Sequence, residues 1–279
     1  LTATVNDKNS GLSKIVYEWG TSTSYGSEKT VVYTTMNGTA TGTTGEVTKT
    51  LSLTDLTYNK TYYARITAYD VAGNSRIATT TFTTKNAVAV TSDVYYTSAQ
   101  NAINSISTSG TVKMIANSTE EVEVVNGKNI TLDLNSKTIT GRMKNYGTLK
   151  IYGGTIDASL VQYGHAIENN GTLTVTSGTY NGYYQGLYSY KGTVTIDNGT
   201  FYGNWYDGVA IGTGKATINN GNFKGGHTGA YAYKETAELI VNNGTFGMKF
   251  ANETKGTSLG AIAVGAGKLT IKDGTFTAA

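Results

Sequence analysis

Aromatic side chains in three polar loops are the residues best suited to bind a ligand. The loops read NGYYQG, GNWYDG and GGHTG, and counting back from the final glycine of each aligns Tyr184, Tyr206 and His227, with Tyr183 and Trp205 one place earlier. Large rings on a water-facing loop lose favourable solvation unless they pack together or contact a ligand. Flat rings suit sugar faces and protein contacts alike. The candidate ligand-binding residues are Tyr183, Tyr184, Trp205, Tyr206, Asp207 and His227.

A purely structural role for these rings is the alternative, in which they cover the ends of the core. The tyrosine pairs Tyr188/Tyr231 and Tyr190/Tyr233 skip a repeat, so we expect them to form no continuous stripe.

Titratable side chains give no comparable cluster. Sugar hydrolysis needs two carboxyl groups about 5–9.5 Å apart, but the aspartates of the repeats fall in different columns. These aspartates are Asp157, Asp197, Asp207 and Asp273. Arg142 and Glu168 are expected to be solvated surface residues, with Ser189 and Ile211 aligned to Glu168 in the next repeats. We therefore expect no catalytic residue and no enzymatic activity in this chain.

Metal and cofactor sites are not expected either. The two histidines, His165 and His227, occupy non-equivalent places in the repeat, and the chain contains no cysteine. The net charge is +3, with lysines scattered along the chain, which does not favour a nucleic-acid partner. No apolar stretch is long enough to span a bilayer, so we expect no membrane insertion.

A sequence motif of about ten residues is repeated through the larger part of the chain. Its copies recur at intervals of about twenty residues or more, which is typical of a solenoid. They read GTLKIYGGTI, GTLTVTSGTY, GTVTIDNGTF, GKATINNGNF, AELIVNNGTF and GKLTIKDGTF, beginning at Gly147, Gly171, Gly192, Gly214, Ala237 and Gly267.

Three apolar columns stay in register through these copies, and two of them alternate with polar residues at period two. That period indicates a strand with one buried face. A glycine after Asn, Asp or Ser favours a turn with positive φ, and a third apolar segment follows in most copies. The pattern predicts a parallel β-helix with three strands per rung. The columns are Leu149/Leu173/Val194/Ala216/Leu239/Leu269, Ile151/Val175/Ile196/Ile218/Val241/Ile271 and Ile156/Tyr180/Phe201/Phe223/Phe246/Phe276.

The turn column is polar, and we interpret it as structural. Stacked amide side chains that form hydrogen bonds between rungs satisfy such turns. This column consists of Ser177, Asn198, Asn220, Asn243 and Asp273.

Residues 1–85 have a different pattern of evenly spaced strands, which predicts a β-sandwich. The segment LTDLTYNKTYYARITAYDVAGNS places Tyr62 six residues after Leu56, and Gly73-Asn74 would form the last hairpin turn. Here the chain resembles immunoglobulin-like and fibronectin type III modules, which implies that Tyr62 is a corner tyrosine and Trp19 a core residue. The expected strands are Leu12–Trp19, Lys29–Thr35, Val47–Leu53, Thr61–Tyr69 and Arg76–Thr83.

Between the two patterns, residues 86–96 are predicted to be a linker and residues 97–106 a helix. TSAQNAINSI places Ala99, Ala102, Ile103 and Ile106 on one face, with Thr97 or Ser98 as N-cap. A helix that leads into the first rung would cover the open end of the core. Residues 97–279, with this helix, resemble a pectate-lyase-like right-handed β-helix, so the whole chain is predicted to be all-β.

The resemblance implies a function for the chain as a whole. Pectate-lyase-like adhesive domains accompany immunoglobulin-like modules in large bacterial surface proteins. A non-catalytic, extracellular adhesin segment is therefore expected, monomeric and displayed at the bacterial cell surface or secreted. Its partner would be a host glycan or a host protein, including an immunoglobulin. The beginning and end of the sequence suggest a piece of a longer chain.

Two other functions stay open. The chain could belong to a polysaccharide lyase, a hydrolase or a phage depolymerase whose catalytic residues lie outside this sequence, because the β-helix hosts all of these activities. It could also be a purely structural spacer at the cell surface.

Overall fold

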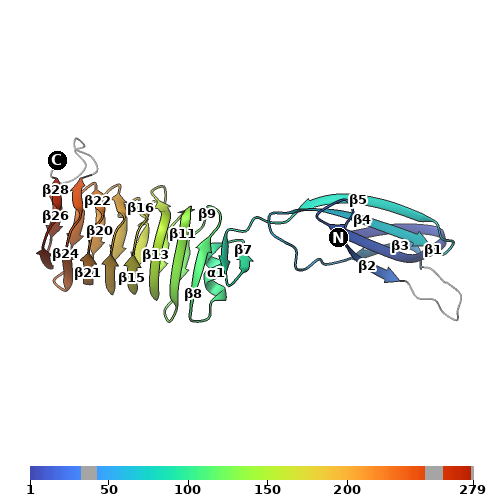
Figure 1. Cartoon of the computed structure of the whole chain (residues 1–279), viewed down its shortest axis with the longest axis horizontal. Coiled ribbons are helices and arrows are strands. Elements are labelled where there is room, and N and C mark those ends of the chain that lie inside the picture. Colours follow the sequence, from blue (N-terminus) through green and yellow to red (C-terminus); the bar gives the residue numbers. More distant parts are fainter. Residues whose placement is uncertain (33–42, 249–259, 278–279) are drawn as a thin grey trace. The chain divides into compact units, whose positions relative to one another are not determined.

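The computed structural model describes residues 1–32, 43–248 and 260–277. Within these ranges the chain forms two compact units, Leu1–Asn86 and Ala87–Ala279. The first contains antiparallel, sandwich-like sheets and the second is a parallel β-solenoid (Figure 1). The expectation of an all-β chain built on a β-solenoid is therefore confirmed.

The N-terminal unit is built around one long strand, β1, whose first part pairs with β3 and whose second part lies between β2 and β4. Leu12, Ile15 and Tyr17 of β1 are fully or almost fully buried in its core. Trp19, expected in this core, lies two residues after Tyr17 on the same face of the strand and is only partly buried, packed against the core from its edge. The strands are β1 (Thr2–Gly20), β2 (Ser27–Val32), β3 (Thr43–Thr50), β4 (Thr61–Asp70) and β5 (Ser75–Thr83).

Tyr62 joins the start of β4 to the preceding loop. Its hydroxyl accepts a hydrogen bond from the Thr57 amide at 3.0 Å, and its ring stacks on Phe82 with centroids 5.6 Å apart. At the far end of β4, Gly73 has φ of +91° and the Asn74 amide donates to Asp70 Oδ1, which makes the predicted turn before β5.

Residues 86–96, predicted to be a linker, contain a β-hairpin instead. Strands β6 (Ala89–Thr91) and β7 (Val94–Tyr96) pair with each other, and β6 also pairs with β8 (Ser109–Met114) of the solenoid. Ser92 and Asp93 both have positive φ, as a tight two-residue hairpin turn requires. Ala89 is fully buried and belongs to the same hydrophobic core as the solenoid strands.

Helix α1 (Ala99–Ser105) follows this hairpin. Ser98 is the N-cap, and its hydroxyl accepts from the Asn101 amide at 3.1 Å. The amides of Ala99 and Gln100 donate to the carboxylate of Glu120 at 2.9 and 3.0 Å. The apolar face of the helix is buried in the solenoid core through Ala99, Ala102 and Ile103.

The strands of the solenoid are parallel and stack rung upon rung (Figure 1). One sheet contains β10 (Val122–Val124), β12 (Met143–Asn145), β14 (Ile167–Asn169), β17 (Leu187–Ser189), β20 (Asp207–Ile211), β23 (Thr228–Ala232) and β26 (Gly260–Val264). We call this sheet D.

The other sheet has two columns of strands that share the long strands β11 (Asn129–Thr140) and β13 (Thr148–Ala158); β8 and β9 (Ser118–Thr119) pair with β11. One column continues with β15 (Thr172–Val175), β18 (Thr193–Ile196), β21 (Gly214–Ile218), β24 (Ala237–Val241) and β27 (Lys268–Ile271). The other continues with β16 (Thr179–Gly182), β19 (Thr200–Gly203), β22 (Asn222–Gly225), β25 (Thr245–Met248) and β28 (Thr275–Thr277).

The repeats pair in the register that the sequence predicts. Leu149, Leu173 and Val194 are partners on successive strands, as are Tyr180, Phe201 and Phe223. The aromatic column stacks with neighbouring ring centroids 4.7–5.4 Å apart from Tyr180 to Phe276. Its rings are buried in the core up to Phe246, whereas Phe276 is exposed. Gly221 in the turn has φ of +137°, and a Cβ there would lie 2.7 Å from the Phe223 ring. Only glycine fits this close approach.

The turn amides do not connect rungs as expected. Asn198, Asn243 and Asp273 each accept from the amide of the following glycine in their own turn, at 2.7–2.8 Å. Ser177, the first member of the column, does connect rungs, because its hydroxyl accepts from the Gly153 amide at 3.1 Å. The other bonds between rungs lie one residue earlier, where Asn219 donates to Asp197 and Asn242 donates to Asn219.

A second amide ladder is fully buried at the end of the sheet D strands. Asn145 donates to Asn169 Oδ1 at 2.7 Å, and Asn169 donates to Ser189 at 3.1 Å and to the Gly171 carbonyl. Both asparagines are completely shielded from solvent.

This ladder generates a stability prediction. Asn169→Ala removes one of the two acceptors of the Asn145 side-chain amide and the acceptor of the Gly171 amide in a dry environment, so we expect a loss of about 2–3 kcal/mol in the free energy of unfolding. The matched control is Asn219→Ala in the half-buried ladder, where water can replace the lost partners and the expected loss is below about 1 kcal/mol. Urea unfolding followed by circular dichroism measures both. Equal losses for the two variants would contradict the prediction.

Candidate functional site

The predicted aromatic loops lie on one another in register. The amides of Trp205 and Tyr206 donate to the carbonyls of Tyr183 and Tyr184 at 3.1 Å, and the His227 amide donates to the Tyr206 carbonyl at 2.8 Å. The loops can stack this closely because β16, β19 and β22 each end in glycine; a Cβ at Gly203 would lie 2.2 Å from the Asp207 carbonyl oxygen.

This stacking gathers the rings. The centroid distances are 6.0 Å for Tyr183 and Trp205, 4.8 Å for Tyr184 and Tyr206, and 5.2 Å for Tyr206 and His227. Trp205 is 44% exposed and Tyr206 36%. The rings therefore pack edge to face or offset while keeping part of their surface in water.

Tyr163 belongs to the same cluster and was missed by the sequence reasoning. It lies 6.2 Å from Tyr183 and 5.4 Å from Tyr184 between ring centroids, and it is 59% exposed. The loop that contains Tyr163 has no exact counterpart in the next repeats. The one feature of the sequence that indicated a role for Tyr163 was its place, as an aromatic residue, just before a third-strand segment. We define the loop aromatic surface as Tyr163, Tyr183, Tyr184, Trp205, Tyr206 and His227.

Asp207 is not part of this surface, and its assignment as a ligand-binding residue has to be corrected. Its side chain is completely buried at the start of β20. It accepts hydrogen bonds from Thr228 at 3.0 Å, Tyr233 at 3.0 Å and Gln185 at 3.3 Å. Burial raises the pKa of Asp207, while these three donors act to lower it. The carboxyl group holds neighbouring rungs together instead of facing a ligand.

Asp207 belongs to a column of buried polar residues, His165, Gln185, Asp207 and Thr228, each two places before an inward apolar residue of sheet D. His165 is 9% exposed, and its Nδ1 atom has no hydrogen-bond partner; Gln185 Oε1 has none either. Burial, with a smaller effect from the charge of Arg142, lowers the pKa of His165 to about 4, and Gln185 opposes this shift only partly.

The tyrosines of sheet D do contact one another, contrary to the expectation of interrupted pairs. Ring centroids are 4.3 Å apart for Tyr188 and Tyr190, 4.0 Å for Tyr231 and Tyr233, and 6.1 Å for Tyr188 and Tyr233. The intervening rung has Ala210 and Gly212 at these places, and their small size lets the rings meet across it. We call Tyr188, Tyr190, Tyr231 and Tyr233 the sheet aromatic surface.

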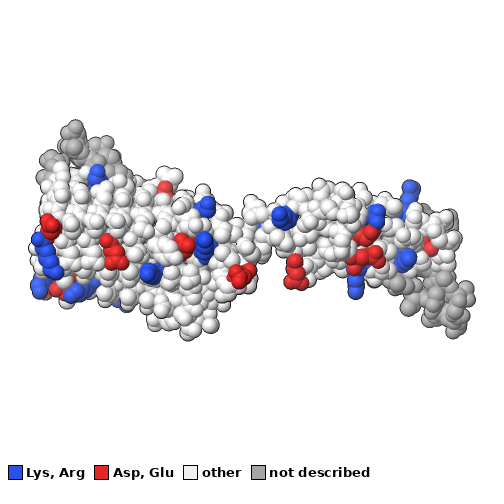
Figure 2. Space-filling model, in the orientation of Figure 1, with Lys and Arg blue, Asp and Glu red and all other residues white. Residues whose placement is uncertain are grey.

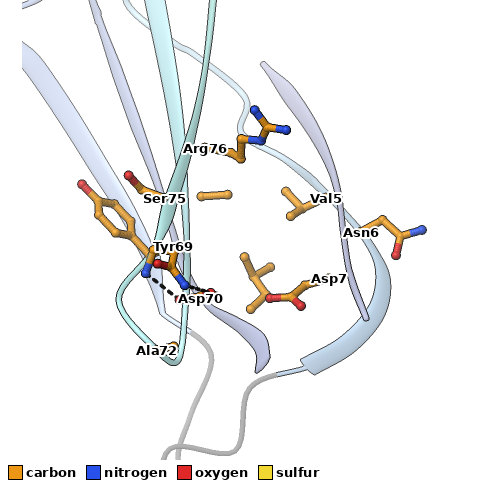
Figure 3. Close-up of a pocket in the computed structure, with 11 residues that line it drawn as sticks. Val5, Asn6, Asp7, Tyr69, Asp70, Ala72, Ser75 and Arg76 are labelled. Carbon is orange, nitrogen blue, oxygen red and sulfur yellow. Dashed lines mark hydrogen bonds between the residues drawn. The ribbon is translucent and has the colours of Figure 1, made fainter. Parts of the chain in front are cut away.

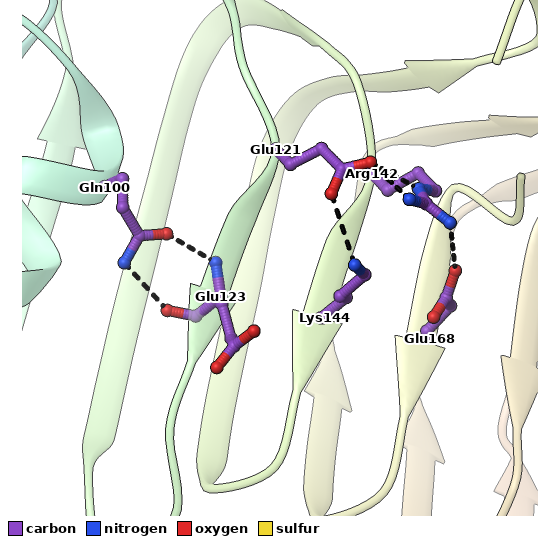
Figure 4. A network of polar contacts seen from close by, with 6 residues as sticks. All are labelled: Gln100, Glu121, Glu123, Arg142, Lys144 and Glu168. Atoms are coloured by element: carbon purple, nitrogen blue, oxygen red, sulfur yellow. Dashed lines mark hydrogen bonds and ion pairs between the residues drawn. The ribbon is translucent and has the colours of Figure 1, made fainter.

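Two carboxylates and two cations meet on neighbouring rungs of the solenoid (Figure 4). Arg142 forms an ion pair with Glu168 at 3.2 Å. The Nε atom of Arg142 also donates to Glu121 Oε1 at 2.7 Å, and Lys144 pairs with Glu121 at 3.2 Å. The expectation of separate, solvated residues is thus wrong for Arg142 and Glu168. We call Glu121, Arg142, Lys144 and Glu168 the charged cluster.

Sequence reasoning missed this cluster because it aligned Glu168 with Ser189. The observed partners are Lys144, Glu168 and Tyr188 on successive strands. The short segments VEV (122–124) and MKN (143–145) carried the missing signal, since they pair in register with Ile167–Asn169.

Burial and charge affect the carboxyl groups of the cluster differently. Burial raises the pKa of Glu168, in spite of the opposing charge of Arg142. For Glu121, burial also acts to raise the pKa, but the hydrogen bonds from Arg142 and Lys144 prevail and its pKa is lowered.

The N-terminal unit contains a cavity of about 640 Å³ at the end of β4, β5 and the first part of β1 (Figure 3). Its lining includes the apolar side chains of Val5, Leu12 and Ala68 and the charged residues Asp7 and Arg76. Asp70, at the same cavity, is engaged by the Asn74 amide and side chain.

Charged side chains lie singly or in small groups of mixed sign on the face shown in Figure 2. In the described ranges, no three His, Cys, Asp or Glu side chains come together in a way that could hold a metal ion. No helix among the described residues is long and apolar enough to cross a membrane.

Comparisons with protein-family models, with curated proteins and with solved structures found no match for this chain.

The burial of His165 predicts a pH dependence of stability. Its pKa is about 4 in the folded chain and about 6.5 when unfolded, so the unfolded state binds more protons between these values and stability falls as the pH drops below 6.5. Between pH 7.5 and pH 5 we expect the wild type to lose about 2 kcal/mol through this group. His165→Phe, which keeps a ring against Tyr188, should lack this loss.

The measurement is urea unfolding of both proteins at pH 7.5 and pH 5. Asp207 and Glu168 have raised pKa values, so their contributions are opposite in sign, with stability falling as pH rises. Both groups are present in both proteins, so their contributions cancel when the pH dependence of the variant is subtracted from that of the wild type. An identical pH dependence for wild type and variant would show that His165 does not titrate as its environment requires.

Proposed function

We propose that this chain is a non-catalytic segment of an extracellular bacterial adhesin, and that it binds a glycan through the loop aromatic surface. The observation that carries the proposal is the set of partly exposed rings on adjacent rungs, from Tyr163 to Tyr206. Aromatic side chains lose little conformational entropy on binding and offer flat faces to the apolar side of a sugar.

The polarity of the surroundings favours a glycan over a protein partner. The loop segments 159–164, 183–186, 204–206 and 226–227 contain no Asp, Glu, Lys or Arg. They do contain amides and hydroxyls, and Trp205 and Tyr206 keep water-exposed edges. Rings with neutral hydrogen-bonding groups between them suit a ligand with apolar faces and many hydroxyl groups. A host protein, including an immunoglobulin, remains the other partner that such rings could bind.

The proposed fold class is a pectate-lyase-like, right-handed β-helix with three strands per rung. Helix α1 would cap its N-terminal end, which the burial of Ala102 and Ile103 supports. The N-terminal unit would be an immunoglobulin-like or fibronectin type III-like module, supported by the contact between the Tyr62 hydroxyl and the Thr57 amide. The module would act as a spacer, and the chain would be monomeric.

A catalytic role is the second candidate, and one observation favours it. Glu168 is a half-buried carboxyl group with a raised pKa beside Arg142, which is the type of environment that tunes a general acid. Two features favour binding instead: Glu121 and Glu168 are both tied up in ion pairs with Arg142, and Asp207 is buried. Release of oligosaccharides from a polysaccharide would support the enzyme, and a failure to bind any partner would support a structural spacer.

The loop aromatic surface predicts the effect of removing its rings. The double variant Trp205→Ala/Tyr206→Ala should weaken binding to any oligosaccharide that the wild type recognises by at least about tenfold, because two exposed contact rings are lost. Screening on an array of neutral and acidic oligosaccharides, followed by calorimetry on the strongest binder, measures this.

The control is Tyr95→Ala in β7, a ring of similar exposure (49%) outside the loop aromatic surface, which should bind as the wild type does. Unchanged affinity in the double variant would rule out this surface as the binding site.

A further inference from the structure

The two aromatic surfaces are continuous. The His165 ring lies between them, with centroids 6.1 Å from Tyr184 in the loop aromatic surface and 5.2 Å from Tyr188 in the sheet aromatic surface. Tyr190 is 6.2 Å from the same ring. Ring contacts therefore connect the loops, through the buried ring of His165, to the outer face of sheet D.

The sheet aromatic surface also remains open to solvent. Tyr190 is 44% exposed, and Tyr188, Tyr231 and Tyr233 are each partly exposed. The Tyr233 hydroxyl is fixed by its bond to buried Asp207, and a Cβ at Gly212 would lie 3.1 Å from the Tyr188 hydroxyl. The rings are thus held in place by the rungs beneath them, which makes a preformed surface.

The charged cluster borders these rings. Glu168 on β14 is the strand partner of Tyr188 on β17. Burial, together with the negative charge of Glu168, raises the pKa of Tyr190. The cluster contains two carboxylates, Glu121 and Glu168, and two cations, Arg142 and Lys144, so its formal charge is zero. It offers hydrogen-bond acceptors and donors side by side without attracting an ionic ligand of either sign.

We propose that the sheet aromatic surface and the charged cluster are additional subsites for the glycan of the proposed function, and that the ligand is an extended, uncharged polysaccharide segment. Sugar rings would lie on Tyr184, Tyr188 and Tyr190 in succession. Their hydroxyl groups would donate to Glu168 and accept from Arg142. The inference rests on the proposed function and adds to it the ligand class and the length of chain that is bound.

Chain-length dependence tests this proposal. The probes are neutral gluco-, manno- and galacto-oligosaccharides of two and of six units, with hexagalacturonate as the acidic counterpart, and affinity is measured by calorimetry. Since a short probe cannot reach both surfaces, we expect a neutral hexasaccharide to bind at least about tenfold more tightly than its disaccharide. Hexagalacturonate should bind more weakly than the neutral hexasaccharide.

Variants identify the subsites. Tyr190→Ala and the shape-conserving Glu168→Gln should each reduce the advantage of the hexasaccharide over the disaccharide by about threefold or more, corresponding to a lost ring contact or hydrogen bond. Tyr95→Ala should leave that advantage unchanged. Thermal unfolding of each variant checks that the solenoid remains folded, and Glu168→Gln preserves the test if Tyr190→Ala disturbs Tyr188.

The outcomes separate this inference from the proposed function. If a neutral hexasaccharide binds and Trp205→Ala/Tyr206→Ala weakens it, but Tyr190→Ala and Glu168→Gln do not, the additional subsites are wrong and the proposed function stands. Preferred binding of hexagalacturonate overturns the uncharged ligand class. Absence of binding to all of these probes overturns the inference, and absence of binding across the full oligosaccharide array overturns the glycan-binding function as well.

Discussion

The parallel register between rungs is the constraint on which the solenoid depends. Hydrogen bonds hold neighbouring strands about 4.8 Å apart, so each side chain lies directly against its counterpart in the next repeat. Inside the core this places Tyr180, Phe201 and Phe223 in a stacked column. On the outside it does the same for Tyr184 and Tyr206. The same parallel register thus produces both the buried aromatic column and the exposed aromatic surface.

Buried polar residues add a second level of order where they form hydrogen bonds with a neighbouring rung. The side chains of Asn145 and Asn169 form a hydrogen bond with each other and are completely shielded from solvent. Asp207 accepts hydrogen bonds from three other residues, including the Tyr233 hydroxyl, and thereby fixes an outer ring from within the core. Stability and surface geometry are coupled at this point.

The outer face of sheet D combines rings with compensated charge. Small residues at 210 and 212 allow tyrosines two repeats apart to touch, and Glu168 and Arg142 border them. This combination suits a ligand that has apolar faces and neutral polar edges. The loops on consecutive rungs and the sheet then act as parts of one surface, connected by the buried ring of His165.

The sequence alone determined the rungs, since apolar columns at period two and glycine turns such as Gly221 leave few other conformations. It also identified the loop rings, because Tyr184 and Tyr206 precede glycines at equal distances. Where repeats differ in length or begin irregularly, only the tertiary structure decided which residues pair and which side chains face inward. Whether Asp207 faces inward, and whether Glu168 meets Arg142 and Tyr188, depends on the register of the segments between repeats. Hydrogen bonding and packing across rungs set that register, and local periodicity does not encode it.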